Sequence, residues 1–288
     1  MARLRFSGHE TFHCRHFWLK KGLDFIDSDT SFSSPKAPVS LGVGKNMVTS
    51  ISFWLKAFNL VNEDSFQKTE LGERLFSEKA WDPYVEDLGT LWILHYSIMK
   101  KNYASIYKMI FQDFRKQKLN SYFTGSELLK YVAAQCVRNS YSFSENSLKN
   151  DVKVFLRNYF AKKDNRKSIE DDFSALLLDL ELITSENLKD ENNELIYKLN
   201  YSDQPKLDGL LFFYGVLDSF EGRESISLDE IQSEVADMFM MNRAGVERII
   251  NGLQERGFVV FKEDSGRKEL QIKNKVSKWD VLEQYYGV

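Results

Sequence analysis

The last third of the chain, residues 204–288, constrains the fold most, because regularly spaced apolar residues there lead into a hairpin signal. In "NRAGVERIINGLQERGF" the apolar residues recur at i, i+3, i+4 and i+7, which predicts an amphipathic helix capped by Asn242 and stopped by Gly257. Two helical stretches precede it, and a capping box at Ser227 opens the second of them. Two short strands follow around a turn at Asp264-Ser265-Gly266. Three helices and a hairpin in this order are typical of a winged helix-turn-helix.

The same order of signals recurs in two earlier parts of the chain. "GKNMVTSISFWLKAFNLV" places its apolar residues on one helical face and runs into a short hairpin signal. "GSELLKYVAAQC", "SENSLKNDVKVFLRNYF" and the strand pair "ELIT" and "LIYKL" form a weaker copy in the middle. We expect a mainly α protein, in which multiple winged helix-turn-helix modules with small β-hairpin wings surround a helical hub. The expected domains are residues 1–80, a winged-helix-like module; 81–203, the hub and a second such module; and 204–288, a C-terminal winged helix.

The composition and net charge of the chain limit the functions that it can have. The chain has 288 residues, 43% of them hydrophobic, and a net charge of −3, so nucleic-acid binding has to come from local basic patches. Cys14 and Cys136 are the only cysteines, which argues against a disulfide framework and fits a reducing compartment. No apolar run approaches the length of a membrane span, and no apolar leader follows Met1. These features predict a cytoplasmic protein without membrane association.

The stretch "FSGHETFHCRHFWLKKG" matches H-E-x-x-H at residues 9–13, the helical zinc signature of metallopeptidases. Ser7-Gly8 directly before His9 favours a loop rather than a helix, and a third ligand at zincin spacing is missing from the sequence. We therefore predict no metal site there, although a metal-dependent hydrolase remains one alternative. The segment is instead expected to anchor the N-terminal module through apolar side chains, namely Phe6, Phe12, Phe17, Trp18 and Leu19.

Basic and amide side chains on the expected helices and wings are candidate DNA contacts. A recognition helix meets base edges, and wing cations neutralise phosphates. The candidates are Arg15, Lys20, Lys21, Lys45, Arg157, Arg243, Arg248, Asn251, Arg267 and Lys268. For the C-terminal module alone, a role in protein contacts is an equal alternative, because Glu247 and Glu255 dilute its positive charge.

Several blocks together resemble a bacterial family known as an uncharacterised domain. They are "FSGHETF" with its following basic and aromatic residues, "GVGKNMVTSISFWLKAFNLV", "DPYVEDLGTLWILH" and "SENSLKNDVKVFLRNY", in the same order over about residues 4–200. Members of that family occur beside sulfur-transferring DNA modification genes in anti-phage islands. One group is the nicking component of the single-strand phosphorothioation (Ssp) system.

The resemblance implies a component of a DNA phosphorothioate modification and defence system that binds double-stranded DNA. The implied protein partners are a sulfurtransferase, a cysteine desulfurase and an ATPase. A stand-alone winged-helix transcriptional regulator is the competing interpretation. The oligomeric state stays open, and a homodimer is compatible with the sequence.

Nicking would need a group that activates water and groups that stabilise charge on phosphorus. His9 and Glu10 are the candidate catalytic residues, against the alternative that both only brace the module. If the chain is a nuclease, the expected cofactor is Mg²⁺, with Asp82, Glu86 and Asp87 as the nearest acidic cluster.

Overall fold

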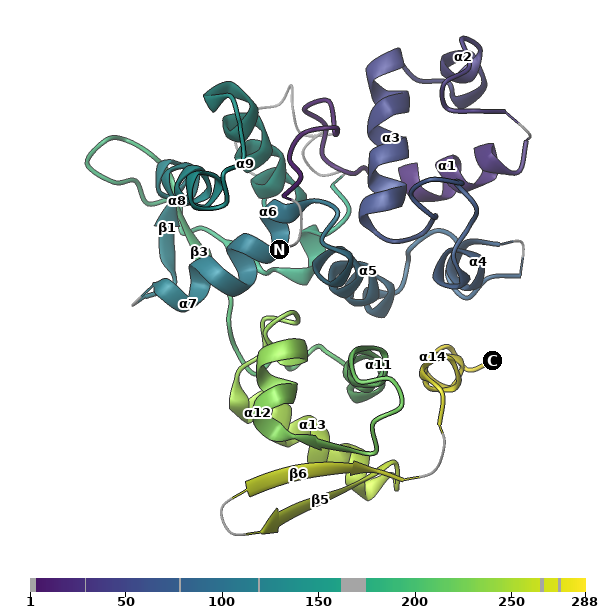
Figure 1. The fold of residues 1–288 in the computed structure, drawn as a ribbon, viewed down its shortest axis with the longest axis vertical. Coiled ribbons are helices and arrows are strands. Elements are labelled where there is room, and N and C mark those ends of the chain that lie inside the picture. The colour runs from purple at the N-terminus through teal and green to yellow at the C-terminus, as the bar shows by residue number, and fades with distance from the viewer. Residues whose placement is uncertain are drawn as a thin grey trace. The chain divides into compact units, whose positions relative to one another are not determined.

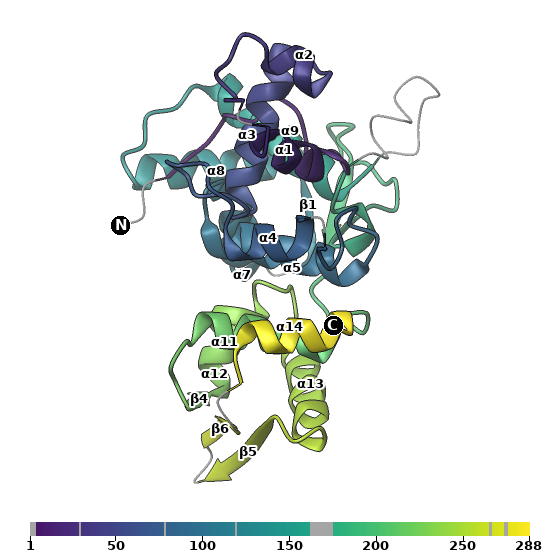
Figure 2. The ribbon, with the colours of Figure 1, turned by 90° about the vertical axis from the view of Figure 1, so that its right-hand side faces the viewer.

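The computed structural model describes residues 4–28, 30–77, 79–118, 120–161, 175–264, 267–273 and 276–288. The chain divides into two compact units, Met1–Asn200 and Tyr201–Val288, each with its own helices and a small sheet (Figure 1; Figure 2). In these described residues, no helix combines the length and apolar character needed to cross a bilayer. Most of the secondary structure is helical, and the sheets are small and antiparallel. The predicted mainly α fold class is therefore confirmed.

The first unit consists of helices followed by a short sheet. Its elements are α1 (Trp18–Ile26), α2 (Ala37–Leu41), α3 (Lys45–Ala57), α4 (Glu70–Phe76), α5 (Leu88–Lys101), α6 (Ser105–Lys108), the π-helix η1 (Met109–Phe114), α7 (Arg115–Gln117), β1 (Tyr122–Thr124), α8 (Gly125–Arg138), α9 (Glu145–Tyr159), the 3-10 helix η2 (Leu178–Leu180), β2 (Ile183–Thr184) and β3 (Ile196–Leu199). Figure 1 shows α1 and α2 beside α3, as their contacts require.

Helix α5 is the centre of the first unit. Every residue from Gly89 to Met99 is buried, and the helix contacts α3, α6 and η2. Its buried His95 bonds through Nδ1 to the hydroxyl of Tyr159 at 2.8 Å. A helix buried on all sides belongs to the interior of a domain. Within residues 81–203, where a helical hub was expected, α5 is therefore a helix in the core of this unit.

The small sheet of the first unit has the strand order β1-β3-β2, with β3 antiparallel to both neighbours. Strand β1 runs directly into α8, because Thr124 ends the strand and also caps the helix. Its side chain accepts from the backbone of Glu127 while Glu127 accepts from the backbone of Thr124, a reciprocal capping box.

The second unit repeats this order of elements. It contains α11 (Gly209–Ser219), β4 (Ser225–Ser227), α12 (Leu228–Ile231), the π-helix η3 (Gln232–Ala236), α13 (Arg243–Glu255), β5 (Val259–Asp264), β6 (Arg267–Ile272) and α14 (Lys278–Tyr286). Its sheet has the order β4-β6-β5, again first, third, second along the chain. Strand β4 also runs directly into a helix, through the predicted capping box of Ser227 and Glu230.

Most of the local predictions for the C-terminal unit are confirmed. Asn242 caps α13 by accepting from the backbone N–H of Gly245 at 3.0 Å, and Gly257 has the left-handed φ of 81° expected after a helix. The predicted hairpin is β5–β6, while its turn residues Ser265 and Gly266 lie outside the described residues. Strand β4 and helix α14 were not predicted.

Candidate functional site

The segment before α1 crosses α3 and α9 as an irregular loop. Ser7, Gly8, Glu10 and Thr11 all have positive φ, between 48° and 94°, so no helix forms over the H-E-x-x-H match. At Gly8 a Cβ atom would lie 2.8 Å from the ring of Phe53, which leaves no room for a side chain. Positive φ at residues other than glycine costs free energy and persists only where surrounding contacts fix the chain. The loop is therefore held by its packing.

His9 provides one of those contacts. The residue is 5% exposed, and its ring stacks on Trp54 with ring centroids 6.2 Å apart. Nε2 lies 3.0 Å from Oδ1 of Asp151, and Nδ1 accepts the backbone N–H of Thr11 at 3.2 Å. Because Nδ1 accepts a hydrogen bond and Nε2 faces a carboxylate, we assign a proton to Nε2, which donates to Asp151. Both nitrogens of the ring are therefore engaged.

Asp151 is the residue at this site that sequence reasoning missed. It is 3% exposed on α9, and its Oδ1 also accepts the backbone N–H of Ser7 at 2.8 Å. Its Oδ2 is buried and has no hydrogen-bond partner within the part of the chain described here. A carboxylate on the apolar face of the predicted helix, three residues after Leu148 and one before Val152, was the available signal.

Two further polar side chains of α9 bind the same loop. Ser147 contacts the hydroxyl of Ser7, and Oδ1 of Asn158 accepts the backbone N–H of Cys14 at 3.0 Å. Asn158 also donates through Nδ2 to the hydroxyl of Tyr107 at 2.6 Å. The polar positions of α9 thus form a stripe that replaces the hydrogen bonds an irregular backbone lacks.

Glu10 behaves differently from His9. It is exposed and has a φ of 48°, so the loop presents the carboxylate to solvent while the neighbouring imidazole is buried. The two candidate catalytic residues are adjacent in sequence but engage different surroundings.

The acidic cluster after Trp81 has a structural role. Oδ1 of Asp82 accepts the backbone N–H of Glu86 at 2.9 Å, while Oδ2 accepts the N–H of Asp87 and the hydroxyl of Thr90. Asp87 then caps α5 by accepting from Gly89 at 2.6 Å. Across the described ranges, no group of three or more His, Cys, Asp or Glu is placed to hold a metal ion. A magnesium site does not fit these side chains in this arrangement.

The basic candidates of the first unit lie at several places. Arg15 is half-buried, with its guanidinium 5.3 Å from the ring centroid of Trp18. Lys20 pairs with Asp24, Lys21 donates to the carbonyl of Leu41 at 3.2 Å, and Lys45 is exposed at the start of α3. Arg157 is half-buried on α9. Lys20 and Lys21 both line the cleft between α1 and α2.

One expected anchor is wrong. Trp18 and Leu19 are buried as predicted, but Phe17 is 65% exposed and contacts His16 edge-on at 5.1 Å. Phe17 directly precedes α1, and the buried face of that helix begins one residue later. An aromatic residue next to an amphipathic helix is not core unless its position matches the helical period.

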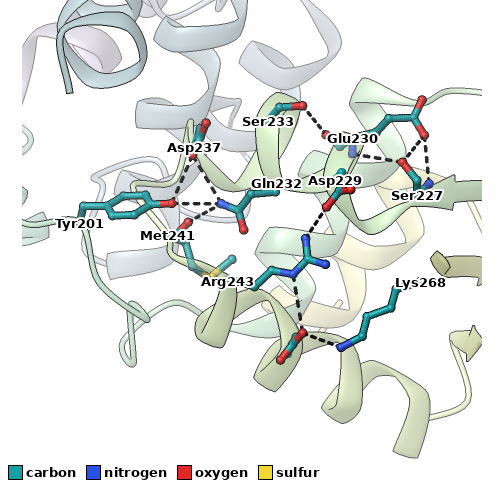
Figure 3. A network of polar contacts seen from close by, with 11 residues as sticks. Tyr201, Ser227, Asp229, Glu230, Gln232, Ser233, Asp237, Met241, Arg243 and Lys268 are labelled. Carbon is teal, nitrogen blue, oxygen red and sulfur yellow. Dashed lines mark hydrogen bonds and ion pairs between the residues drawn. The ribbon is translucent and has the colours of Figure 1, made fainter. Parts of the chain in front are cut away.

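In the second unit, Arg243 and Lys268 are paired with carboxylates (Figure 3). Arg243 contacts Asp229 at 2.9 Å and Glu247 at 3.6 Å, and Lys268 contacts Glu247 at 3.1 Å. All four side chains are at least one-third exposed, so a phosphate could replace the carboxylates. Two of the cations predicted to contact DNA, Arg243 and Lys268, thus lie in one chain of ion pairs with Asp229 and Glu247.

Arg248 has a different geometry from Arg243. Its guanidinium donates to the carbonyls of Asp203 at 3.0 Å and Gln204 at 3.1 Å, which ties α13 to the start of the unit. Asn251 is exposed on the same helix. Arg267 begins β6, and its side chain lies outside the described residues.

The fold and surfaces define a mainly helical protein of two units with exposed cations and a buried histidine–carboxylate pair. The chain belongs to the family described as "Protein of unknown function (DUF4007)", whose model matches residues 6–286. Two solved structures are similar to it at 25% identity, each over 99% of this chain and 88% of the other. They are "Magnesium ion-bound SspB crystal structure", with a TM-score of 0.82, and "SspB crystal structure", with a TM-score of 0.80. No curated protein matches the chain.

Proposed function

We propose that this protein is the SspB-like component of a DNA phosphorothioate modification and defence system, and that it binds and nicks double-stranded DNA. The observation that carries the proposal is the likeness to SspB, which extends over 99% of the chain with a TM-score of 0.82. Because the similarity covers 99% of the chain, it extends over both structural units and is not limited to one shared module. The Ssp system has several proteins, and we propose that a sulfurtransferase, a cysteine desulfurase and an ATPase act with this chain.

The order of helices and strands in both units supports our proposal that each contains a winged helix. Each contains a short strand, a helix opened by a capping box, a second helix and two strands, with the sheet order first, third, second. Helix α13 would then be a recognition helix and β5–β6 its wing. The candidate contacts from this unit are Arg243, Asn251 and Lys268, which are accessible enough to exchange a carboxylate or water for phosphate.

For the nicking step we propose separate roles for His9 and Glu10. Hydrolysis forms a bond from a water oxygen to phosphorus and breaks one phosphate ester bond. A base takes the proton of the attacking water, and the leaving sugar oxygen takes a proton from solvent. Glu10 is the exposed candidate for that base. Both nitrogens of His9 are bonded, which supports a positioning role for this residue. No step is assigned to a metal, because the described carboxylates do not converge.

The nicking proposal is tested with purified protein and supercoiled plasmid. Conversion to open circles, duplex affinity and melting temperature are measured for Glu10→Gln and His9→Ala. Glu10→Gln is expected to abolish nicking with affinity and melting unchanged. His9→Ala is expected to lower nicking and melting together. Glu73→Gln, a matched change at an exposed carboxylate of α4, is the control. Nicking by Glu10→Gln at the wild-type rate would exclude Glu10 as the base.

Duplex binding is tested separately by gel shift at several salt concentrations. Release of counterions from phosphate predicts a steep loss of affinity with salt. Arg243→Ala with Lys268→Ala is expected to weaken binding and flatten the salt dependence. Lys149→Ala with Lys153→Ala, at two exposed lysines of α9, serves as the charge-matched control. An unchanged affinity in the double variant would assign this surface to protein contacts.

A further inference from the structure

A cleft of about 690 Å³ lies between α1 and α2 in the first unit, within the size range of ligand sites. Its rim carries three of the large apolar side chains that the molecule exposes. Phe17 is 65%, Val39 86% and Tyr84 54% exposed. Such side chains usually stand singly on a surface, and their gathering at one cleft marks a binding surface.

The cleft also carries positive charge beside the rings. Phe17, Lys20 and Lys21 are spaced i, i+3 and i+4, so the ring and both ammonium groups lie on one side of α1. Lys20 pairs with Asp24 and Lys21 donates to the Leu41 carbonyl, which holds both amines at the cleft. Each ammonium has three N–H donors, so both retain donors for an incoming anion.

From this arrangement we infer that the cleft binds an unpaired stretch of a nucleic-acid strand, with bases on Phe17 and Tyr84 and phosphates at Lys20 and Lys21. Aromatic faces beside a positively charged groove are the recurring means of holding single strands. Base pairs in a duplex already stack on their neighbours, so exposed rings favour a strand whose bases are unpaired. The inference rests on the proposed action on DNA and deepens it by naming the form of DNA bound.

Fluorescence anisotropy with 5′-fluorescein-labelled (dT)12 and the full chain tests this assignment. Phe17→Ala and Tyr84→Ala are each expected to weaken binding at least about fivefold, the lower end of the loss seen for one stacked base. Asp24→Asn should tighten binding, because it frees Lys20 and removes a negative charge. Tyr122→Ala is the matched control, since Tyr122 is 40% exposed and lies on β1, outside the cleft.

The outcomes separate this inference from the proposed function. If the wild-type chain binds neither (dT)12 nor a duplex, the proposed function fails. If it binds (dT)12 and the two ring variants bind equally well, or Tyr122→Ala weakens binding as much, the cleft assignment fails alone. A peptide of alternating Glu and Phe is the second probe. Binding of that peptide through Phe17 and Val39, without binding of (dT)12, would make the cleft a protein-docking site and overturn the inference.

Discussion

Nε2 of His9 lies 3.0 Å from Oδ1 of Asp151, and the two residues are 142 positions apart in the sequence. Both residues are almost completely buried, with side-chain exposures of 7% and 3%. This pair joins the loop before α1 to helix α9. The carboxylate also holds the N–H of Ser7, so one side chain satisfies two donors of a loop that makes few regular backbone bonds.

Replacing Asp151 with Ala is expected to lower the free energy of unfolding by about 3 kcal/mol, because two buried donors lose their acceptor. Asp151→Asn keeps an oxygen at the same place and should cost about 1 kcal/mol. Urea denaturation followed by tryptophan fluorescence measures both, since Trp54 stacks on His9. Asp64→Ala, at an exposed carboxylate, should change little. Equal losses for Ala and Asn at position 151 would contradict the hydrogen-bond explanation.

Gly8→Ala should destabilise the first unit by about 2 kcal/mol. The new Cβ would lie 2.8 Å from Phe53, and φ at this position is 94°. Gly125→Ala is the same substitution at the first residue of α8, where φ is not positive and no atom lies within 4 Å. It should leave stability unchanged or raise it by a few tenths of a kcal/mol, on the order known for helix starts. Similar melting temperatures for the two variants would refute the packing argument.

Arg248 and Arg243 should respond differently to replacement. Arg248→Ala removes two bonds to the carbonyls of Asp203 and Gln204 and is expected to cost about 1 kcal/mol, a value reduced for exposure. Arg243→Ala removes exposed ion pairs and should cost about 0.5 kcal/mol or less. Thermal melting separates them. A larger loss for Arg243 would show that the ion pairs, rather than the carbonyl contacts, stabilise the second unit.

Cys14 and Cys136 should resist alkylation in the native protein. Both thiols are buried, and burial raises the pKa of Cys136 to about 11 and that of Cys14 well above its usual value. Because the thiolate is the reactive form, iodoacetamide at pH 8 should label both only after denaturation. Because folding raises both pKa values, the protonated thiols favour the folded state. Their contribution to the free energy of unfolding is complete below pH 9 and falls as the pH rises towards 11. Rapid native labelling detected by mass spectrometry would contradict the burial of the thiols.

Glu230 should titrate far below a normal glutamate. Hydrogen bonds from Arg223 and Ser227 lower the pKa of its carboxyl to about 2. Because the pKa is lowered in the folded state, the ionised carboxylate of Glu230 stabilises the fold at pH values above its ordinary pKa near 4.5. This stabilisation is lost as the pH falls towards 2. NMR titration of the side-chain carboxyl provides the measurement. In Arg223→Ala the midpoint should move up, and an unchanged midpoint would rule out the ion pair as its cause.

Features that depend on neighbouring residues were predictable from the sequence. The cap at Asn242 and the capping box at Ser227 involve partners three residues away, so the pattern contains all the required information. Strand β4 has only three residues and becomes a strand by pairing with β6, more than forty positions later. Such a segment has no periodicity of its own to detect.

The candidate site was less predictable, because its contacts join distant segments. His9 was singled out, but Asp151 was not, since proximity across 142 positions leaves no local pattern. The cleft likewise joins Phe17 to Tyr84. Arg248 was a candidate DNA contact and is exposed on its helix, yet the carbonyls that it binds belong to a segment before α11.

Strands β1 and β4 each pass into a helix without an intervening loop, at Thr124 and Ser227. The capping-box hydrogen bonds at these two residues fix the backbone where the strand becomes the helix. We therefore expect each strand and the helix that follows it to move as one piece.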